Sequence, residues 1–216
     1  MDFDTKEIPI GNPFNLERKK SEFPSAQKHL SGVSSRVFDK QKQSVLGKKD
    51  KSKKGSIDPK IKKLVDLINS KKDYYTTSSC SGRIVLIEVG KNQKLDARWL
   101  YVSHESISLE QIQNDLQQKF NHKLWFKFES SILHVCCRTI EDASILQQIV
   151  FSIGMKRSGI IAAKKRVIVE IIGTDGIEAL IGKDGQLLAS DLLLNELVIE
   201  ANRKLKRNHE KLKRLM

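Results

Sequence analysis

The stretch that decides the fold is Tyr74-Tyr75-Thr76-Thr77-Ser78-Ser79-Cys80-Ser81-Gly82-Arg83, followed directly by Ile84-Val85-Leu86-Ile87-Glu88-Val89. The second part is a short apolar run rich in β-branched residues, which predicts a buried strand. We therefore interpret the polar decapeptide as a loop at the rim of the core, where binding and catalytic groups concentrate. An ordinary serine-rich turn that enters a strand is the alternative, and composition alone does not separate the two.

Outward from this stretch, strands come in groups of two or three and are followed by a helix. Such an order predicts a single α+β domain with two similar strand-and-helix halves. Asp58 before Pro59 predicts a helix start, with the Asp58 side chain as its cap. Further caps are predicted at Ser108 (with Gln111 as a capping box), at Thr139, and at Ser190 or Asp191. The expected later strands are 99–102, 124–129, 132–138, 167–172 and 177–181.

The chain has 216 residues and a formal net charge of +13, which favours a polyanionic partner. Residues 1–60 carry 14 Lys/Arg against 8 Asp/Glu and residues 201–216 carry 7 against 1, whereas residues 61–200 are nearly balanced at 18 against 17. We predict a flexible basic arm at 1–35, a folded domain at 36–206 and a basic helical tail at 207–216. The Lys-rich run at 47–55 reads as a basic linker or a weak nuclear-import sequence, and solvated tails are the alternative for both ends.

The three cysteines, Cys80, Cys136 and Cys137, have no C-x-x-C spacing, which favours a reduced, intracellular protein. The first residues lack the basic and apolar regions of a secretory leader, and no apolar run approaches the roughly 20 residues of a spanning helix. We therefore expect a cytoplasmic protein with no membrane partner. The Lys-rich run gives a weak case for import into the nucleus.

Several standard sites are missing from the sequence. Gly173–Gly176 and Gly182–Gly185 read as hairpin turns, so no G-x-G-x-x-G motif follows a strand and a Rossmann-type fold is not expected. No phosphate-binding loop and no G-x-S-x-G elbow occurs, and Cys80 lacks the arginine spacing of a phosphatase. His134 and Cys136 occupy alternate strand positions that could touch a metal. No second pair has ligand spacing, so we expect no metal site.

A set of polar residues projects from otherwise apolar strands: Arg83, His104, Glu129, His134 and Arg138. Arginine binds phosphate or carboxylate with two parallel hydrogen bonds, and histidine accepts or relays a proton near neutral pH. Satisfied, half-exposed strand residues are the alternative for each of them. The aromatic residues that could stack on a splayed base are Trp99, Trp125, Tyr75 and Tyr101, although Trp125 alternates with Leu124 and Phe126 and reads as mostly structural.

The chain resembles the tRNA wybutosine-synthesizing protein 3 family over roughly residues 36–206. The resemblance rests on the segments Asp50–Asp58, Tyr75–Arg83, Val102-Ser103-His104, Phe126–Glu129 and Ile132–Val135, and on Trp99, Arg138, Ser158-Gly159 and Leu187-Leu188. The sequence departs from the family pattern at Ser130, Met155, Leu180, Leu192 and Leu193. These departures fall in expected turns and on the last helix, so they bear on local geometry more than on the assignment.

The resemblance implies an α+β fold with a mixed, barrel-like sheet and a methyltransferase that uses S-adenosylmethionine. Its implied substrate is phenylalanine tRNA, methylated at ring nitrogen N4 of a tricyclic base beside the anticodon; other enzymes of the wybutosine pathway are implied partners. We expect His104, His134 and Glu129 to be the catalytic groups. The expected binding residues are Ser52, Lys54, Ser78, Ser79, Cys80, Ser81, Gly82, Arg83, Trp99, Arg138 and Ser158. A non-catalytic RNA-binding protein on the same scaffold is the alternative.

Overall fold

The computed structural model describes residues 35–47, 57–91 and 96–216. Nearly all of the expected arm at 1–35 lies outside these residues, and so do the predicted binding residues Ser52 and Lys54. Within the described ranges no helix combines the length and the apolar character needed to cross a membrane.

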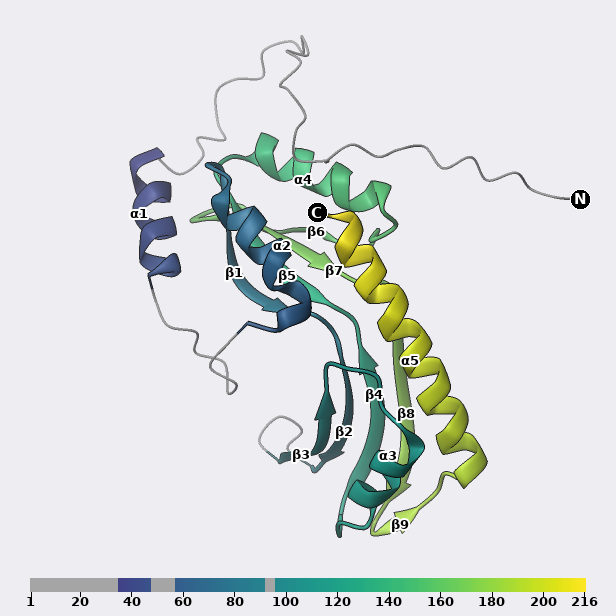
Figure 1. Cartoon of the computed structure of the whole chain (residues 1–216). Coiled ribbons are helices and arrows are strands. Elements are labelled where there is room, and N and C mark those ends of the chain that lie inside the picture. The colour runs from purple at the N-terminus through teal and green to yellow at the C-terminus, as the bar shows by residue number, and fades with distance from the viewer. Residues whose placement is uncertain (1–34, 48–56, 92–95) are drawn as a thin grey trace, which may run out of the picture.

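The described strands form two sheets (Figure 1). All seven pairings between neighbouring strands of these sheets are antiparallel, whereas the resemblance implied a mixed sheet. The first sheet has the order β1 (Tyr74–Cys80), β5 (Ile132–Cys137), β7 (Val167–Ile172) and β6 (Gly159–Ala162). The second has the order β3 (Ala97–Ser103), β2 (Arg83–Val89), β4 (Lys123–Glu129), β8 (Gly176–Lys183) and β9 (Gln186–Leu187).

Three chain segments pass from one sheet into the other. The crossovers are Ser81-Gly82 between β1 and β2, Ser130-Ser131 between β4 and β5, and residues 173–175 between β7 and β8. We call these three crossovers the junction. Because of them the two sheets form one curled surface, and the expected α+β, non-Rossmann, barrel-like class is confirmed. The two halves are not successive along the chain, since three segments contribute a strand to each.

Two predictions for the central segments were wrong. Residues 74–80 are not a loop but strand β1, because Tyr75 is fully buried and the segment pairs along its length with β5. Residues 173–176 are not a hairpin turn, because β7 and β8 lie in different sheets. In both cases long-range strand pairing overrides the local preference of Ser, Thr, Asp and Gly for turns.

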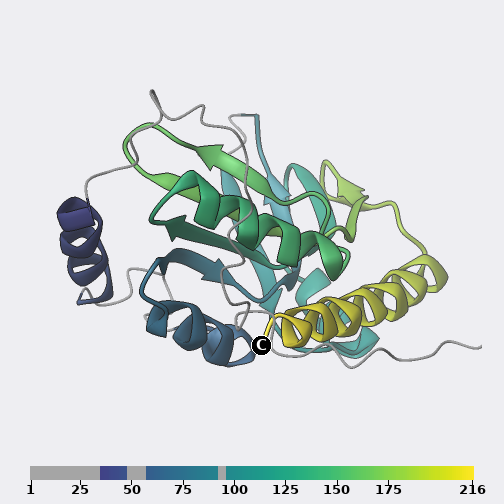
Figure 2. The same cartoon turned by 90° about the horizontal axis from the view of Figure 1, so that it is seen from above.

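One face of each sheet is covered by helices α2 (Pro59–Ser70), α3 (Leu109–Leu116), α4 (Ile140–Ser152) and α5 (Asp191–Arg214). Helices α2 and α4 pack on the first sheet, while α3 and α5 pack on the second. Helix α1 (Ser35–Leu46) lies on the opposite side of the molecule from α5 and touches β1 through Phe38 and Tyr75 (Figure 2). We call the sheet face away from α2, α3, α4 and α5 the open face.

The helix ends follow the sequence with one exception. Ser108 forms the predicted capping box, and Thr139 and Ser190 cap their helices through the side chain. Asp58 precedes α2 as predicted, but its carboxylate makes no capping hydrogen bond. The segment predicted as a basic tail at 207–216 forms the last part of α5, and its residues Leu212 and Leu215 are buried in the core under the first sheet.

Candidate functional site

The inner side of the junction is held by Asn208, a side chain of α5 that is only 2% exposed. Its Nδ2 donates to the carbonyl oxygen of Ser81 at 2.7 Å, and its Oδ1 accepts from the backbone N–H of Ser131 at 3.0 Å. The Gly173 N–H in turn donates to the Ser131 carbonyl at 3.0 Å. One amide side chain and its neighbours therefore tie all three crossovers together, and buried backbone groups that lack strand partners are satisfied.

Asp58 approaches the same crossover from the start of α2. Its Oδ2 accepts from the Ser81 N–H at 3.0 Å and from the Ser81 hydroxyl at 3.3 Å. The same oxygen lies 3.3 Å from Nδ1 of His104. Asp58 is buried, so its charge is balanced by these donors rather than by water. The carboxylate that the sequence suggested as a helix cap therefore links β1 to His104.

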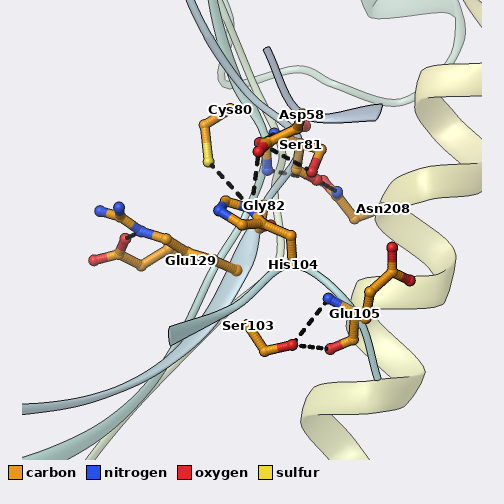
Figure 3. A network of polar contacts seen from close by, with 11 residues as sticks. Asp58, Cys80, Ser81, Gly82, Ser103, His104, Glu105, Glu129 and Asn208 are labelled. Atoms are coloured by element: carbon orange, nitrogen blue, oxygen red, sulfur yellow. Dashed lines mark hydrogen bonds and ion pairs between the residues drawn. The ribbon is translucent and has the colours of Figure 1, made fainter. Parts of the chain in front are cut away.

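Gly82 brings the backbone close to both sides of the junction. It has φ of +94°, and a Cβ at this position would lie 2.9 Å from Asn208 Nδ2 and 3.2 Å from the Glu129 carbonyl oxygen. A larger residue would therefore be strained in its backbone and would clash. The Gly82 carbonyl lies 2.8 Å from Nδ1 of His104, and Figure 3 shows His104 between Glu129 on one side and Asn208 on the other.

These contacts fix the tautomer of His104. Nδ1 faces a carbonyl oxygen and a carboxylate oxygen, both of which only accept hydrogen bonds. Nδ1 must therefore carry a proton, and in the neutral ring Nε2 is the nitrogen with a free lone pair. A carboxylate on one ring nitrogen and a basic lone pair on the other is the arrangement of a general base.

On the open face, the first residue of β2, Arg83, forms an ion pair with the last residue of β4, Glu129. Arg83 Nε donates to Glu129 Oε2 at 2.6 Å, and the guanidinium carbon lies 4.5 Å from the centre of the Trp99 ring. Arg83 and Glu129 are partly exposed, so both remain able to contact a ligand. A guanidinium, a carboxylate and an indole face thus lie together at the edge of the junction.

A second polar group crosses the open face of the first sheet. The His134 Nε2 donates to Glu170 Oε2 at 2.9 Å, which leaves Nδ1 to accept from the Ser78 hydroxyl at 2.9 Å. Ser78 and Glu170 lie on the strands that flank His134, on β1 and β7. Both nitrogens of His134 therefore have protein partners, whereas Nε2 of His104 has no hydrogen-bond partner among the residues that the structure describes.

Comparison with known proteins shows which family the chain belongs to. The family described as Methyltransferase TYW3 matches residues 39–216. The chain belongs to this methyltransferase family. It is 39% identical over 165 residues to a Pyrococcus horikoshii protein named tRNA(Phe) 7-((3-amino-3-carboxypropyl)-4-demethylwyosine(37)-N(4))-methyltransferase 1. The aligned region covers 76% of this chain and 84% of that protein.

Two further relatives support the TYW3 assignment. The Xenopus laevis protein named tRNA wybutosine-synthesizing protein 3 homolog is 37% identical over 183 residues, covering 82% of this chain and 72% of that protein. The solved structure of the PH1069 protein from Pyrococcus horikoshii superposes with a TM-score of 0.77 at 37% identity, covering 84% of this chain and 95% of that one. Sequence and fold therefore agree, and the family expected from the sequence is confirmed.

Cys80 lies next to His104, but its thiol is not activated as a nucleophile. Its sulfur is 4.0 Å from His104 Nδ1, and burial raises the pKa of the thiol, so that it stays protonated near neutral pH. Ligand atoms of Asp58, Cys80 and His104 lie within 4.8 Å of one another. A metal bound there through Nδ1 would have to break the hydrogen bond from His104 to Gly82, and the geometry is better explained by that bond.

Three of the predicted binding residues lie away from this group. Arg138 pairs with Asp73 and Asp39, each at 2.7 Å, at the far end of β5, and it holds α1 through a contact with the Phe38 ring. Ser158 is buried and its hydroxyl accepts from the Ile172 N–H at 3.0 Å. Ser79 pairs with the core residue Leu133 and therefore lies on the helix-covered side of β1.

The sequence did not indicate Asn208 or Glu170, and it indicated Asp58 only as a helix cap and as the last residue of the family-like stretch 50–58. Asp58 looked like a helix cap because it precedes Pro59. Asn208 sits in a basic segment of a long helix, and Glu170 alternates with apolar residues in a strand, as solvent-facing residues do. Only the strand register and the docking of α5 bring these side chains to their partners.

Proposed function

We propose that this TYW3 family member transfers a methyl group from S-adenosylmethionine to ring nitrogen N4 of the aminocarboxypropyl-demethylwyosine base in the anticodon loop of phenylalanine tRNA. The observation that carries the proposal is His104, whose Nδ1 donates to the Gly82 carbonyl and lies 3.3 Å from Asp58 Oδ2, so that Nε2 carries the lone pair of the neutral ring. The names of the Pyrococcus and Xenopus relatives support the reaction and its substrate.

The role assigned to His104 follows from the proton balance. When N4 bonds to the incoming methyl carbon and the carbon–sulfur bond breaks, the ring nitrogen must lose its proton. Nε2 of His104 accepts that proton, and Asp58 stabilises the resulting imidazolium through Nδ1. Asp58 is itself held by Ser81, so the histidine is oriented before the substrate binds.

The residues beside His104 fit the charges of the methyl donor. S-Adenosylmethionine supplies an activated methyl group on a positively charged sulfur, and it carries a carboxylate, an ammonium group and an adenine ring. Arg83 would hold the carboxylate, and Glu129 would stabilise the positive charges. Correct alignment of donor and acceptor contributes on the order of 7–11 kcal/mol to such displacements.

The second histidine is assigned a positioning role. Because His134 has Ser78 on one nitrogen and Glu170 on the other, it keeps the Ser78 hydroxyl directed across the open face. We expect Ser78 to bind a polar group of the substrate there. His134 would then act through Ser78 and not as the primary proton acceptor.

The experiment is methylation of precursor phenylalanine tRNA by the purified full chain. The tRNA is taken from a strain that lacks this gene and is incubated with S-adenosylmethionine. Mass spectrometry of the digested nucleosides should show the hypermodified base gaining one methyl group at N4. An unchanged base, together with intact tRNA binding, would instead establish the alternative of a non-catalytic RNA-binding protein.

A further inference from the structure

Four side chains form a row straight across the open face of the second sheet. The strand register aligns Trp99 with Ile87, Ile87 with Trp125, and Trp125 with Leu180. We call these four residues the aromatic row. Trp99 is 38% exposed and Leu180 is 37% exposed, although both side chains are large and apolar. The chain has two tryptophans, and both lie in this row.

The aromatic row faces away from the core. The neighbours of Trp125 in the chain, Leu124 and Phe126, are fully buried against α3 and α5, and side chains alternate along a strand. Trp125 therefore lies on the open face and not in the core with Leu124 and Phe126. No described helix packs on this side of the second sheet. An uncovered apolar row of this kind marks a binding surface.

Each indole of the row has a cation beside it. The Arg83 guanidinium lies 4.5 Å from the centre of the Trp99 ring, and the Lys127 ammonium lies 5.4 Å from the centre of the Trp125 ring. Lys127 also pairs with Glu178 at 2.7 Å, which keeps it over the sheet. The surface therefore combines flat aromatic faces with positive charge, and it continues into the candidate site through Arg83 and its partner Glu129.

We propose that the aromatic row is a stacking platform for unpaired nucleobases of the RNA loop that carries the methylated base. Indole faces and guanidinium planes stack on any base, while nearby cations contact the phosphates. An apolar protein partner would have to desolvate Arg83 and Lys127, whereas an RNA loop matches both the rings and the charges. The inference rests on the proposed function for the identity of the loop.

The spacing of the aromatic row assigns it to the neighbours of the target nucleotide. Strands lie about 4.8 Å apart, so Trp99 and Trp125 are separated by roughly 10 Å and accept different bases. Ile87 follows Arg83 by four residues along β2, which is about 13 Å of extended chain. Bases on the row would therefore flank the one presented to His104, and the loop must be unstacked to reach both places.

The test uses the intrinsic fluorescence of the two tryptophans. Trp99→Phe and Trp125→Phe each leave one indole, so each reports on one position. The full chain is titrated with an RNA hairpin that has the anticodon-loop sequence, and with a fully paired duplex of equal length. We expect the hairpin to quench both single-tryptophan proteins and the duplex to quench neither. Equal quenching by the duplex, or no quenching by the hairpin, would overturn the proposal.

Substitution measures how much the row contributes. Trp125→Ala should weaken hairpin binding roughly tenfold, in the range found when one base–aromatic stack is removed. It should raise the KM for tRNA more than it lowers kcat. Ile145→Ala on α4 is the matched control, since Ile145 is apolar and 39% exposed but lies on a helix away from this face. If Trp125→Ala and Ile145→Ala bind the hairpin equally well, the proposal that the row stacks nucleobases is wrong.

A second variant covers the case in which Trp125→Ala fails to fold. Leu180→Glu places a carboxylate at the exposed end of the row and should also weaken hairpin binding, whereas Ile145→Glu, with the same charge change, should not. These readouts need no methyl transfer. Quenching without methylation would reject the proposed reaction and keep the platform, while methylation with no effect of Trp125→Ala or Leu180→Glu would do the reverse.

Discussion

Two groups of polar side chains flank Gly82, one on the inner side of the junction and one on its outer side. Asp58, Ser81 and Asn208 are buried, and their hydrogen bonds end on backbone groups or on one another. Arg83 and Glu129 are partly exposed and bond to each other at the edge of the open face. The same kinds of side chain therefore serve different ends: the inner group fixes where the strands cross, and the outer group is available to a ligand.

This division has a physical basis. A buried polar group whose partner is removed costs about 1–3 kcal/mol, whereas an exposed ion pair contributes roughly 0–1 kcal/mol. Inner substitutions should therefore change the free energy of unfolding, and outer substitutions should change catalysis at nearly constant stability. His104 connects the two groups, since its Nδ1 contacts the inner side and its Nε2 is assigned to the substrate.

The largest expected effect tests His104. His104→Ala should lower kcat by roughly 10²- to 10⁴-fold, the usual contribution of a positioned acid or base. His134→Ala is the matched control and should lower kcat by less than about tenfold, because His134 acts through Ser78. Single-turnover methylation of precursor tRNA measures both. If the two variants lose the same activity, the assignment of His104 as proton acceptor is wrong.

The next effect tests the inner group. Asn208→Ala leaves the Ser81 carbonyl and the Ser131 N–H buried without their partner, which should destabilise the fold by about 3 kcal/mol and lower Tm by roughly 10 °C. Asn202→Ala is the control on the same helix, since Asn202 also bonds both backbone groups of one residue, Ile107, but is only half-buried. It should lower Tm by less than half as much in a thermal melt.

The contrast between the inner and the outer group would fail if a substitution in the inner group lowered the methylation rate of the folded protein. At a temperature where Asn208→Ala is folded, we expect its kcat/KM to stay within about tenfold of the unaltered chain. A loss as large as that of His104→Ala would mean that small shifts of the junction decide catalysis. The distinction between the two sides of Gly82 would then be one of degree.

The outer group is tested by Arg83→Lys. A lysine keeps the charge but loses the planar fork, so the variant should raise the KM for S-adenosylmethionine roughly tenfold. Tm should change by no more than a few degrees, because the pair with Glu129 is partly exposed. Arg98→Lys, at the other end of β2 and β3 in a pair with Glu88, is the control for a general arginine effect. Equal changes in both variants would contradict a ligand-binding role for Arg83.

The smallest effect concerns His209, which follows Asn208 on α5. Burial lowers the pKa of His209 from its ordinary value of 6.5, and the positive charge of Lys60 lowers it further. The unfolded chain therefore binds a proton near pH 6.5 that the folded chain takes up only at lower pH. Stability should consequently decrease as the pH falls below about 6.5.

Thermal melts between pH 7.5 and 5 check this prediction. His209→Asn should make Tm less dependent on pH over this window, while His122→Asn, at an exposed histidine, should leave the slope unaltered. We expect the change in slope to amount to a few degrees at most. A slope that is the same in all three proteins would show that His209 does not couple protonation to folding.

The sequence predicted those features that are encoded locally. The apolar run 84–89 became β2, the capping box at Ser108 formed, and Thr139 and Ser190 start their helices, because caps and strand patterns depend on residues close in the chain. The polar segment 74–80 was missed as a strand because its pairing with β5 is decided by residues about 60 positions away. The turn assigned to 173–176 failed for the same reason.

For the site, the sequence indicated the residue types but not their connections. Arg83 and Glu129 were both singled out, yet their pairing follows only from the alignment of β2 with β4. Asp58 was interpreted as a cap because a helix start explains an Asp before a Pro. Arg138 was grouped with the site because it ends an apolar strand, and the structure instead bonds it to Asp73 and Asp39.

The junction also has a consequence for how the protein is made. Asn208 follows Ser81 by 127 residues and Ser131 by 77, so the side chain that joins these crossovers is synthesised well after both of them. Closing contacts over such separations is slow, and chains fold progressively as they leave the ribosome. The contacts of Asn208 with Ser81 and Ser131 can form only after α5 has been synthesised. A chain without α5 would therefore lack the side chain that bonds both Ser81 and Ser131, and two of the three crossovers would lose their shared partner.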